Sequence, residues 1–348
     1  MNSSENFYQR QMSLPEVGVQ GQEQLGKSHV LVVGAGGLGC PVLEYLCAAG
    51  VGHISICDFD TIDYSNLHRQ VIYCPDDVGL FKASIAAKRL SRQNPHIKIS
   101  VSLQEFGLGY PLEGIDLIID CTDNFKAKFM CHDLSYQQKI PLIQASIHKF
   151  EGQINVFKFN ENNDNAPCMR CLWPQTPERT CVQTCSEAGV LGVVPGVVGT
   201  LQANEAIKLL IGLPTLHQGA TLFIDLLNFS SMNIAWQKNK ECPLCNNYQV
   251  ALETFDYEPS SFELNWQQVR GGDYMLINVS NTEKSAIEPC LMSSLDGIVN
   301  DTQHLDKECK IVLFCNRGIT SLKAAKLMRS AGYNQCFSLK EGSQGCKK

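Results

Sequence analysis

The 348-residue sequence has little of several features that would mark it for a membrane, for secretion or for nucleic acid. It has no run of 18 apolar residues, and its polar start, MNSSENFYQRQ, lacks the apolar segment of a secretory signal. Basic residues are outnumbered, 29 against 35 acidic ones, and the net charge is −6. This balance argues against a nucleic-acid or membrane-surface binder, whose footprint would be basic. We therefore expect a cytoplasmic globular protein, with about two domains at roughly 150 residues each.

Cysteine is the residue type that is abundant, with 17 of the 348 residues. A small secreted scaffold held by disulfides would be shorter and much denser in cysteine. A reducing compartment is therefore expected, in which the cysteines serve as core residues, metal ligands or reactive thiols.

The order of apolar runs predicts an α/β fold. Residues 29–33 (HVLVV) form a β-branched run directly before GAGGLG, an apolar segment with helical spacing extends to Gly50, and a second run (53–57) ends at Asp58. This strand–turn–helix–strand order is how a Rossmann-like, doubly wound parallel sheet begins. Further runs extend the pattern, so we expect one domain over residues 1–248, a linker at 249–262 and a smaller α/β domain at 263–348.

The turn GAGGLG fits the G-x-G-x-x-G pattern of nucleotide-binding sites. At the start of a helix, its backbone N–H groups and the helix dipole attract phosphate. Asp58 lies 24 residues after the first glycine and could hold ribose hydroxyls. The alternative is a turn that is rich in glycine only to pack the helix closely. The candidate nucleotide-binding residues here are Gly34, Gly36, Gly37, Gly39 and Asp58.

Charged residues after this turn narrow the choice of nucleotide. Each of them alone would be an ordinary surface group, and a dinucleotide needs few cations. Together, basic and acidic residues suit a triphosphate with Mg²⁺, whose charge must be neutralised during transfer. The sequence therefore favours ATP. The residues concerned are Asp60, Asn66, Arg69, Gln70, Lys82 and Asp123.

The segment from Arg10-Gln11 through GAGGLG, DFD, NLHRQ and DCTDN resembles the ubiquitin-activating-type adenylyltransferases of the MoeB/ThiF/HesA family, over about residues 7–245. The resemblance implies that Asp58 contacts ribose, that Arg69 and Lys82 contact the phosphates, and that Asp123 binds Mg²⁺. It also implies a homodimer in which Arg10 reaches the neighbouring subunit's site. The substrate would be the Gly-Gly end of a small ubiquitin-like sulfur carrier of the ThiS or MoaD type.

Two C-x₂-C pairs predict a structural metal site. Cys168 and Cys171 form the first pair, and Cys242 and Cys245 form the second. Four thiolates in a reducing compartment suit tetrahedral zinc, and such a site is closed and does not catalyse. The alternatives are coincidence or a redox pair, and the repeated spacing makes both weak. The MoeB/ThiF/HesA family is similar at both pairs.

Between the pairs, Cys185 stands three residues before Ala188-Gly189 and matches the family's reactive loop cysteine. The resemblance implies that it takes part in sulfur or acyl transfer. Cys181 lies four residues earlier and could compete with it or pair with it. The choice between the two cysteines stays open.

A further cysteine, Cys315, follows the apolar run 311–314 and precedes a predicted helix. Backbone N–H groups that converge there would stabilise a thiolate or persulfide anion. The segment resembles the active loop of rhodanese sulfurtransferases, so we expect a rhodanese-like domain. The domain departs from the family at residues 278–280, where Asn-Val-Ser replaces the usual Asp-Val-Arg, and at Asn316 and Thr320, where arginines are common. Sulfur transfer by Cys315 and a degenerate docking domain are both possible.

These observations predict an ATP-dependent adenylyltransferase that acts on a sulfur carrier in thiamine or molybdenum-cofactor synthesis. A persulfide donor such as a cysteine desulfurase would supply the sulfur. One alternative is an NAD(P)-dependent oxidoreductase, but the sequence shows no catalytic His or Tyr–Lys pair. Another alternative is a non-catalytic, zinc-clamped scaffold that recruits carriers.

Overall fold

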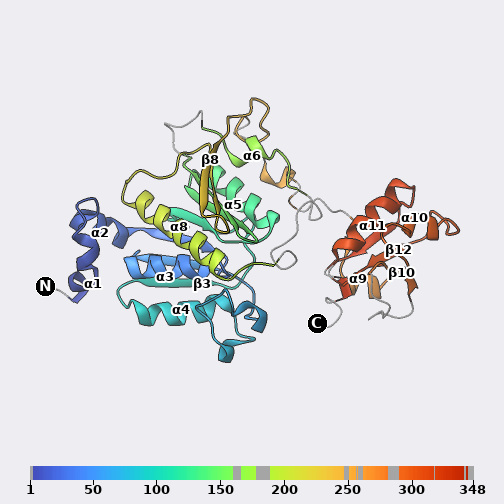
Figure 1. Ribbon diagram of the computed structural model, residues 1–348, viewed down its shortest axis with the longest axis horizontal. Coiled ribbons are helices and arrows are strands. Elements are labelled where there is room, and N and C mark those ends of the chain that lie inside the picture. Colours follow the sequence, from blue (N-terminus) through green and yellow to red (C-terminus); the bar gives the residue numbers. More distant parts are fainter. Residues whose placement is uncertain are drawn as a thin grey trace. The chain divides into compact units, whose positions relative to one another are not determined.

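The computed structural model describes residues 3–159, 166–177, 189–246, 251–255, 257, 262–280, 290–316, 318–340 and 342–343. The chain forms two compact units (Figure 1). Unit 1 runs to Tyr257, with an interruption at residues 177–183, and unit 2 contains residues 258–348. Within the described residues, no helix has the length and apolar character needed to cross a membrane.

Unit 1 is built around an eight-stranded sheet in the order β3-β2-β1-β4-β5-β6-β7-β8. Strands β1 to β5 are parallel, and β6, β7 and β8 are antiparallel. The predicted Rossmann-like sheet is therefore confirmed. The strands are β1 (His29–Val33), β2 (His53–Cys57), β3 (Lys98–Ser102), β4 (Leu117–Asp120), β5 (Leu142–His148), β6 (Glu151–Phe157), β7 (Ala220–Asp225) and β8 (Ser230–Ala235). The helices are α1 (Ser3–Met12), α2 (Gly18–Lys27), α3 (Gly39–Ala49), α4 (Lys82–Gln93), α5 (Phe125–Gln138), α6 (Met169–Leu172) and α8 (Val193–Leu210), with short 3₁₀ turns η1 (Tyr64–Asn66), η2 (Pro75–Asp77) and η4 (Leu252–Thr254).

Alternating side chains of the central strands build a core on each face of this sheet. Val30 and Val32 of β1 belong to the core that α3 and α8 cover, whereas Leu31 and Val33 belong to the core that α5 covers. Because both faces are buried, the central strands are apolar at nearly every position. The second core also contains Leu252 and Tyr257, so part of the segment predicted as a linker packs against unit 1.

Helix α1, which carries Arg10, is held against the end of α3. Gly50 ends α3 with φ of +83°, and a Cβ there would lie 2.6 Å from the ring of Tyr8. The Tyr8 hydroxyl accepts a hydrogen bond from Asn94 Nδ2 at 2.7 Å. These contacts fix the helix, and the side chain of Arg10 is exposed to solvent.

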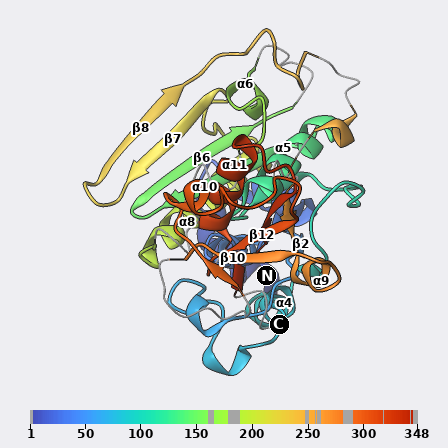
Figure 2. The same ribbon diagram turned by 90° about the vertical axis from the view of Figure 1, so that its right-hand side faces the viewer.

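Unit 2 is a smaller α/β layer with a parallel sheet in the order β11-β10-β12-β13-β9. Helices α10 and α11 cover one face, and α9 packs on the other (Figure 2). Its elements are β9 (Glu263–Leu264), α9 (Trp266–Arg270), β10 (Met275–Asn278), β11 (Leu291–Met292), α10 (Ile298–Asp301), β12 (Ile311–Phe314), α11 (Ile319–Ser330) and β13 (Cys336–Leu339).

Several cysteines outside the predicted metal and loop sets are core residues of these two units. Burial raises the pKa of the Cys40 thiol to about 12 and that of Cys47 to about 11. Thiols of this kind remain protonated and pack as small apolar groups. The buried set is Cys40, Cys47, Cys57, Cys121, Cys131 and Cys336.

Candidate active site and metal centre

The glycine-rich turn lies between β1 and α3, and its glycines have two different roles. Gly34 has φ of +96°, and a Cβ on Gly39 would lie 2.1 Å from the Gly34 carbonyl oxygen. These two positions are glycine because the backbone packs too closely for a side chain. Gly36 differs, since a Cβ there would meet Gln70 Nε2 at 3.5 Å and nothing nearer. The turn is therefore open to a ligand at Gly36.

Asp58 holds this turn in place from the end of β2. Its Oδ2 accepts a hydrogen bond from Ala35 N at 2.7 Å, and its Oδ1 accepts one from Asp60 N at 2.8 Å. Burial raises the pKa of this carboxyl, while the positive charge of Lys82 opposes the rise. The residue therefore has a structural role in the turn, and its contact with ribose stays a prediction.

Two of the predicted phosphate contacts, Lys82 and Arg69, have partners near the turn. Lys82 Nζ lies 2.9 Å from Asp60 Oδ2, and the Lys82 side chain is 9% exposed while that of Asp60 is 56% exposed. Arg69 donates a hydrogen bond to the Ser65 carbonyl oxygen at 3.0 Å. Both cations are held by weak, exposed acceptors, so a phosphate can compete for them.

The Gln70 side chain lies beside the open glycine, with its Nε2 nearest to Gly36. The residue is 4% exposed, and within the described part of the chain its Oε1 is buried without a hydrogen-bond partner. A buried polar atom without a partner costs free energy that a ligand can recover. The open turn at Gly36 and the two cations therefore fit a phosphate group, and the Gln70 oxygen, which is an acceptor, fits a hydroxyl or amino group of a nucleoside.

The buried carboxylate of Asp120 organises the end of β4, and sequence reasoning missed its partners Lys128 and Gln144. Lys128 Nζ lies 3.2 Å from Asp120 Oδ2, and Gln144 Nε2 donates to the same oxygen at 2.8 Å. The predicted magnesium ligand Asp123 is exposed in the turn that follows, directly before Asn124, which caps α5. A usable signal was the spacing of Lys128, which follows the cap residue by one helical turn and therefore faces back toward β4.

The ends of three neighbouring strands bring these groups to one edge of the sheet. Val33 pairs with Cys57 on one side and with Asp120 on the other, so Gly34, Asp58 and the turn of Asp123 follow adjacent strands. The strand order reverses at β1, and such a switch point is where α/β sheets bind ligands. Of the other predicted residues, Arg10 lies on α1 of this unit, and Cys185 and Cys181 fall outside the described residues.

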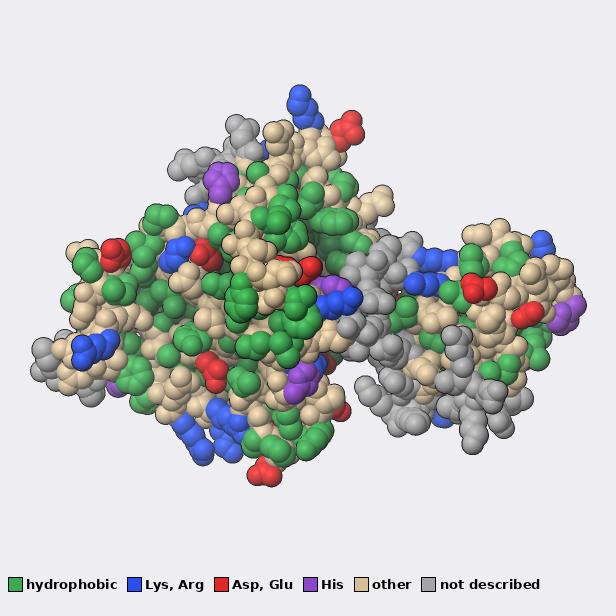
Figure 3. Space-filling model, viewed as in Figure 1, with side chains coloured by type: hydrophobic (Ala, Val, Ile, Leu, Met, Phe, Trp, Pro, Cys, Tyr) green, Lys and Arg blue, Asp and Glu red, His purple; other side chains and the backbone are tan. Residues whose placement is uncertain are grey.

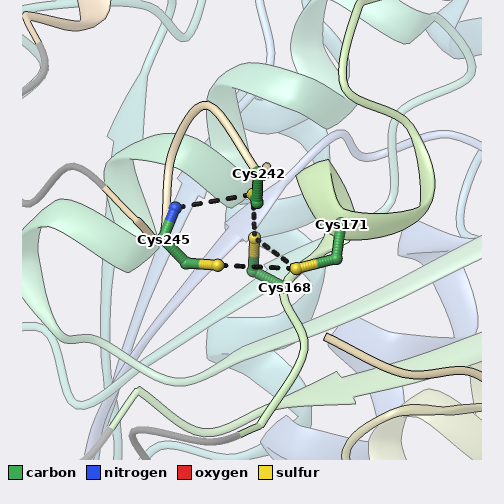
Figure 4. Close-up of side chains that lie close together, drawn as sticks. All are labelled: Cys168, Cys171, Cys242 and Cys245. Carbon is green, nitrogen blue, oxygen red and sulfur yellow. Dashed lines mark hydrogen bonds between the residues drawn. The ribbon is translucent and has the colours of Figure 1, made fainter. Parts of the chain in front are cut away.

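The four cysteines of the two C-x₂-C pairs form one cluster (Figure 4). Their sulfur atoms all lie within 4.8 Å of one another, and all four residues are buried. Neighbouring Sγ–Sγ distances are 3.8 Å for Cys168–Cys171, 3.6 Å for Cys168–Cys242 and 3.4 Å for Cys171–Cys245. Tetrahedral zinc with Zn–S bonds of about 2.3 Å requires sulfur atoms roughly 3.8 Å apart.

The protonation of the cluster also fits a cation. A hydrogen bond from Cys168 lowers the pKa of the Cys171 thiol, whereas the same pairing raises the pKa of Cys168. The pKa of Cys242 is also lowered, to about 7, first by its hydrogen bond with Cys168, so protonated neighbours favour thiolates within the cluster and further ionisation would place like charges together. Four thiolates at this spacing need a divalent cation, and the residues present fit zinc.

In unit 2, Cys315 lies between β12 and α11 and is 5% exposed. Its Sγ accepts a hydrogen bond from the N–H of Gly318 at 3.2 Å and lies 3.6 Å from Ser321 Oγ. The Ser321 hydroxyl in turn pairs with Ser338 Oγ at 2.9 Å. The backbone N–H directed at the sulfur favours its anionic form.

At the position where Asn-Val-Ser replaces Asp-Val-Arg, the side chain of Asn278 points to its own turn and not to a substrate. Its Oδ1 accepts hydrogen bonds from Ser280 N at 2.9 Å and Ser280 Oγ at 2.7 Å. Asn278 is 2% exposed, so this departure from the rhodanese pattern ends strand β10 with a local turn.

Comparison with known proteins identifies the family. The model of the ThiF family matches residues 8–244. The sulfur carrier protein adenylyltransferase of Thermus thermophilus is 42% identical over 72% of this chain and 94% of its own length. The adenylyltransferase and sulfurtransferase MOCS3 of Drosophila sechellia is 34% identical over 93% of this chain and 78% of its own length. The chain therefore belongs to the ThiF family, and it is an adenylyltransferase.

Solved structures agree at the level of the fold. The crystal structure of E. coli MccB with MccA-N7isoASN superposes with a TM-score of 0.61 at 21% identity, over 71% of this chain and 76% of that one. The alignment with MOCS3 also extends through residues of unit 2, which is consistent with the rhodanese-like resemblance of that unit.

The different roles of the glycines give a first prediction. Gly36→Ala should weaken ATP binding at least tenfold while leaving the melting temperature close to that of the parent protein, because the methyl group projects into open space. Gly39→Ala should lower the melting temperature by several degrees, because its Cβ would overlap the Gly34 carbonyl. Isothermal titration with ATP and thermal unfolding measure the two effects. Equal effects of both substitutions on stability would contradict the assignment.

Proposed function

We propose that the protein adenylylates the C-terminal glycine carboxylate of a ubiquitin-like sulfur carrier ending in Gly-Gly and releases pyrophosphate. The observation that carries the proposal is the turn that is open at Gly36, with Gln70 and two cations around it. Relatives named sulfur carrier protein adenylyltransferase support the choice of substrate. Both ThiS-like and MoaD-like carriers are candidates, for thiamine and molybdenum-cofactor synthesis respectively.

The residues at the sheet edge suit this reaction. A carboxylate oxygen of the carrier forms a bond to the α-phosphorus of ATP, the bond to the bridging oxygen breaks, and pyrophosphate leaves with the electron pair. The nucleophile is already an anion, so no general base is needed, and the requirement is to bring two anions into line.

Each cofactor contact is assigned to a residue of unit 1. Asp58 is assigned to ribose, Arg69 and Lys82 to the phosphates, and Asp123 to Mg²⁺. When bound, Mg²⁺ supplies a Lewis acid that neutralises charge on the leaving pyrophosphate. In this assignment, a phosphate oxygen would replace Asp60, the exposed partner of Lys82. Asn66 and Gln70 complete the nucleotide-binding set.

A homodimer is part of the proposal. The segment between β2 and α4 exposes six large hydrophobic side chains. Hydrophobic side chains group at the lower edge of unit 1 in Figure 3. A second copy of the chain would cover this surface, and Arg10 would enter the site of that copy. The exposed residues are Phe59, Tyr64, Val71, Val78, Leu80 and Phe81.

Unit 2 supplies the sulfur in this scheme. Cys315 takes up a persulfide from a donor such as a cysteine desulfurase, and the terminal sulfur attacks the acyl-adenylate carbon and displaces AMP. A second thiolate then attacks the Cys315 sulfur of this acyl disulfide, forms a disulfide with Cys315 and releases the carrier as a thiocarboxylate, and a small-molecule thiol reduces that disulfide before the next turnover. We assign the attacking thiolate to Cys185, with Cys181 as the alternative. The hydrogen bonds of Cys315 support its part in the scheme.

Exchange of labelled pyrophosphate into ATP tests the adenylylation step. We expect exchange with Mg²⁺ and a Gly-Gly-ended carrier, and none with a carrier that lacks its last glycine. Asp123→Ala should reduce the exchange about 100-fold or more while zinc content and folding stay unchanged. Glu23→Ala removes an exposed carboxylate of α2 and serves as the matched control. Failure of exchange with both carrier types would instead favour the scaffold alternative.

Mixing two inactive variants tests the role of Arg10. If Arg10 acts in the neighbouring site, the dimer of an Arg10→Ala chain with an Asp123→Ala chain contains one complete site. After subunits are exchanged, pyrophosphate exchange should recover to roughly a quarter of that of the parent protein, because half of the dimers are mixed and half of their sites are complete. Mixtures that stay as inactive as the separate variants would place Arg10 in its own subunit's site.

Substitution of the unit 2 cysteine separates the two steps. Cys315→Ser should abolish thiocarboxylate formation from a persulfide donor, measured by the mass of the carrier, and leave pyrophosphate exchange unchanged. Cys309→Ser, a half-buried cysteine of the same unit, is the control and should have no effect. Thiocarboxylate formation at the normal rate in Cys315→Ser would show that unit 2 only docks partners.

A further inference from the structure

A second buried carboxylate, Asp133 of α5, lies outside the sheet edge and takes no part in the proposed reaction. Four donor groups converge on its two oxygens. Arg170 donates through Nε at 3.1 Å and through its terminal nitrogen at 2.6 Å, His132 donates from Nδ1 at 2.9 Å, and the Tyr257 hydroxyl donates at 2.9 Å. Burial opposes ionisation of this group, but the donors His132 and Arg170 keep the pKa of Asp133 below its usual value.

Two of these partners hold the first cysteine pair. Arg170 is one of the two residues between Cys168 and Cys171, and the other is Met169. The backbone N–H of Met169 donates to His132 Nε2 at 2.9 Å, and the opposite ring nitrogen of His132 donates to Asp133. Both residues between the two ligands are therefore fixed to one helix turn of α5.

Arg170 is held on its flat faces as well as at its edge. The guanidinium carbon lies 4.1 Å from the centre of the Phe255 ring and 4.6 Å from that of Phe129. A terminal nitrogen donates to the Pro174 carbonyl oxygen at 3.1 Å, and the residue is 1% exposed. A guanidinium that is hydrogen-bonded along its edge and packed against aromatic rings on its faces is held in a single orientation.

Among the described residues, the second cysteine pair has no such hydrogen bonds to α5. The chain that follows this pair does contact Asp133, through Tyr257. Cys242 N donates to the Asn239 carbonyl oxygen at 3.1 Å, within its own turn. Tyr257, which lies beyond this pair and is the last residue of unit 1, brings the chain back to the carboxylate of Asp133. One side chain thus joins the first pair to the segment that follows the second.

We propose that Asp133 is a positioning residue for the metal centre, which holds the first cysteine pair in ligand geometry and couples zinc retention to the anchoring of residues 251–255 and 257. The inference rests on zinc binding at the four cysteines and not on adenylylation. Groups that orient metal ligands from outside the coordination sphere affect metal affinity about 10- to 100-fold. The coupling is reciprocal, because anything that stabilises the anchored segment also stabilises the bound metal.

Transfer of zinc from the full-length holoprotein to a chromogenic chelator tests the first part. Asp133→Asn should speed the transfer about 10- to 100-fold. Tyr257→Phe keeps the ring and removes a single hydrogen bond, so it should speed the transfer several-fold and remain folded. Glu205→Gln, which alters a buried carboxylate of α8 that pairs with Lys208, is the matched control and should leave the rate unchanged.

Circular dichroism of the zinc-loaded proteins shows whether each variant is folded. If Asp133→Asn does not fold, Tyr257→Phe alone decides the first part. Zinc transfer at the parental rate in every folded variant would overturn the proposal, since a carboxylate that only packs α5 against α6 has no effect on metal release.

Hydrogen exchange tests the coupling. The amides of Thr254 and Phe255 donate to the carbonyl oxygens of Ala251 and Leu252 in the anchored segment. Removal of zinc from the parent protein should speed their exchange at least tenfold, and this difference should shrink in Tyr257→Phe. Identical exchange with and without zinc would overturn the coupling, whatever the adenylylation activity of the protein.

Discussion

The ligand-binding edge of unit 1 depends on the buried carboxylate of Asp120. One of its oxygens accepts hydrogen bonds from the Thr122 backbone and hydroxyl, and the other receives Lys128 and Gln144. Its backbone carbonyl accepts a hydrogen bond from Gln202 of α8. Removing the cation partner of a buried carboxylate lowers the free energy of unfolding by about 3–5 kcal/mol. These contacts hold the turn that carries Asp123 between α5, β5 and α8. Asp123 is therefore exposed to solvent on a turn that is fixed in position.

The glycine turn shows how one sequence pattern meets two demands. Gly34 and Gly39 are required by backbone contact, while Gly36 leaves room next to the side chain of Gln70. Close packing of the helix and binding of a nucleotide are therefore not alternative explanations of the pattern, because different glycines serve each purpose. A turn this tightly packed does not need to rearrange before a phosphate approaches, which lowers the entropic cost of binding.

The sequence predicted what local patterns determine. Apolar runs located strands β1, β2 and β4, because both faces of these strands are buried, and the two C-x₂-C pairs predicted the cysteine cluster. Strand β8 was missed, since all of its side chains are exposed and no alternation marks it. Asp133 was missed for a different reason. Its partner Arg170 is 37 residues away in sequence, and no spacing rule reports such a pair. Lys128 was missed although its position one turn after the cap of α5 was a usable signal. The predicted linker was drawn too broadly at its start, because Leu252 and Tyr257 are apolar or aromatic without periodicity and still find a place in the core of unit 1.

The buried thiols have a consequence for the sulfur transfer that we propose. Exchange between a persulfide and a thiol begins with a thiolate, so a thiol whose pKa is near 11 or 12 is a slow partner at neutral pH. Core cysteines such as Cys40 and Cys336 therefore exchange slowly with a persulfide. A metal would occupy four more cysteines. A protein rich in cysteine can in this way restrict a reactive sulfur atom to a few reactive cysteines and prevent its transfer to the other cysteines of the chain.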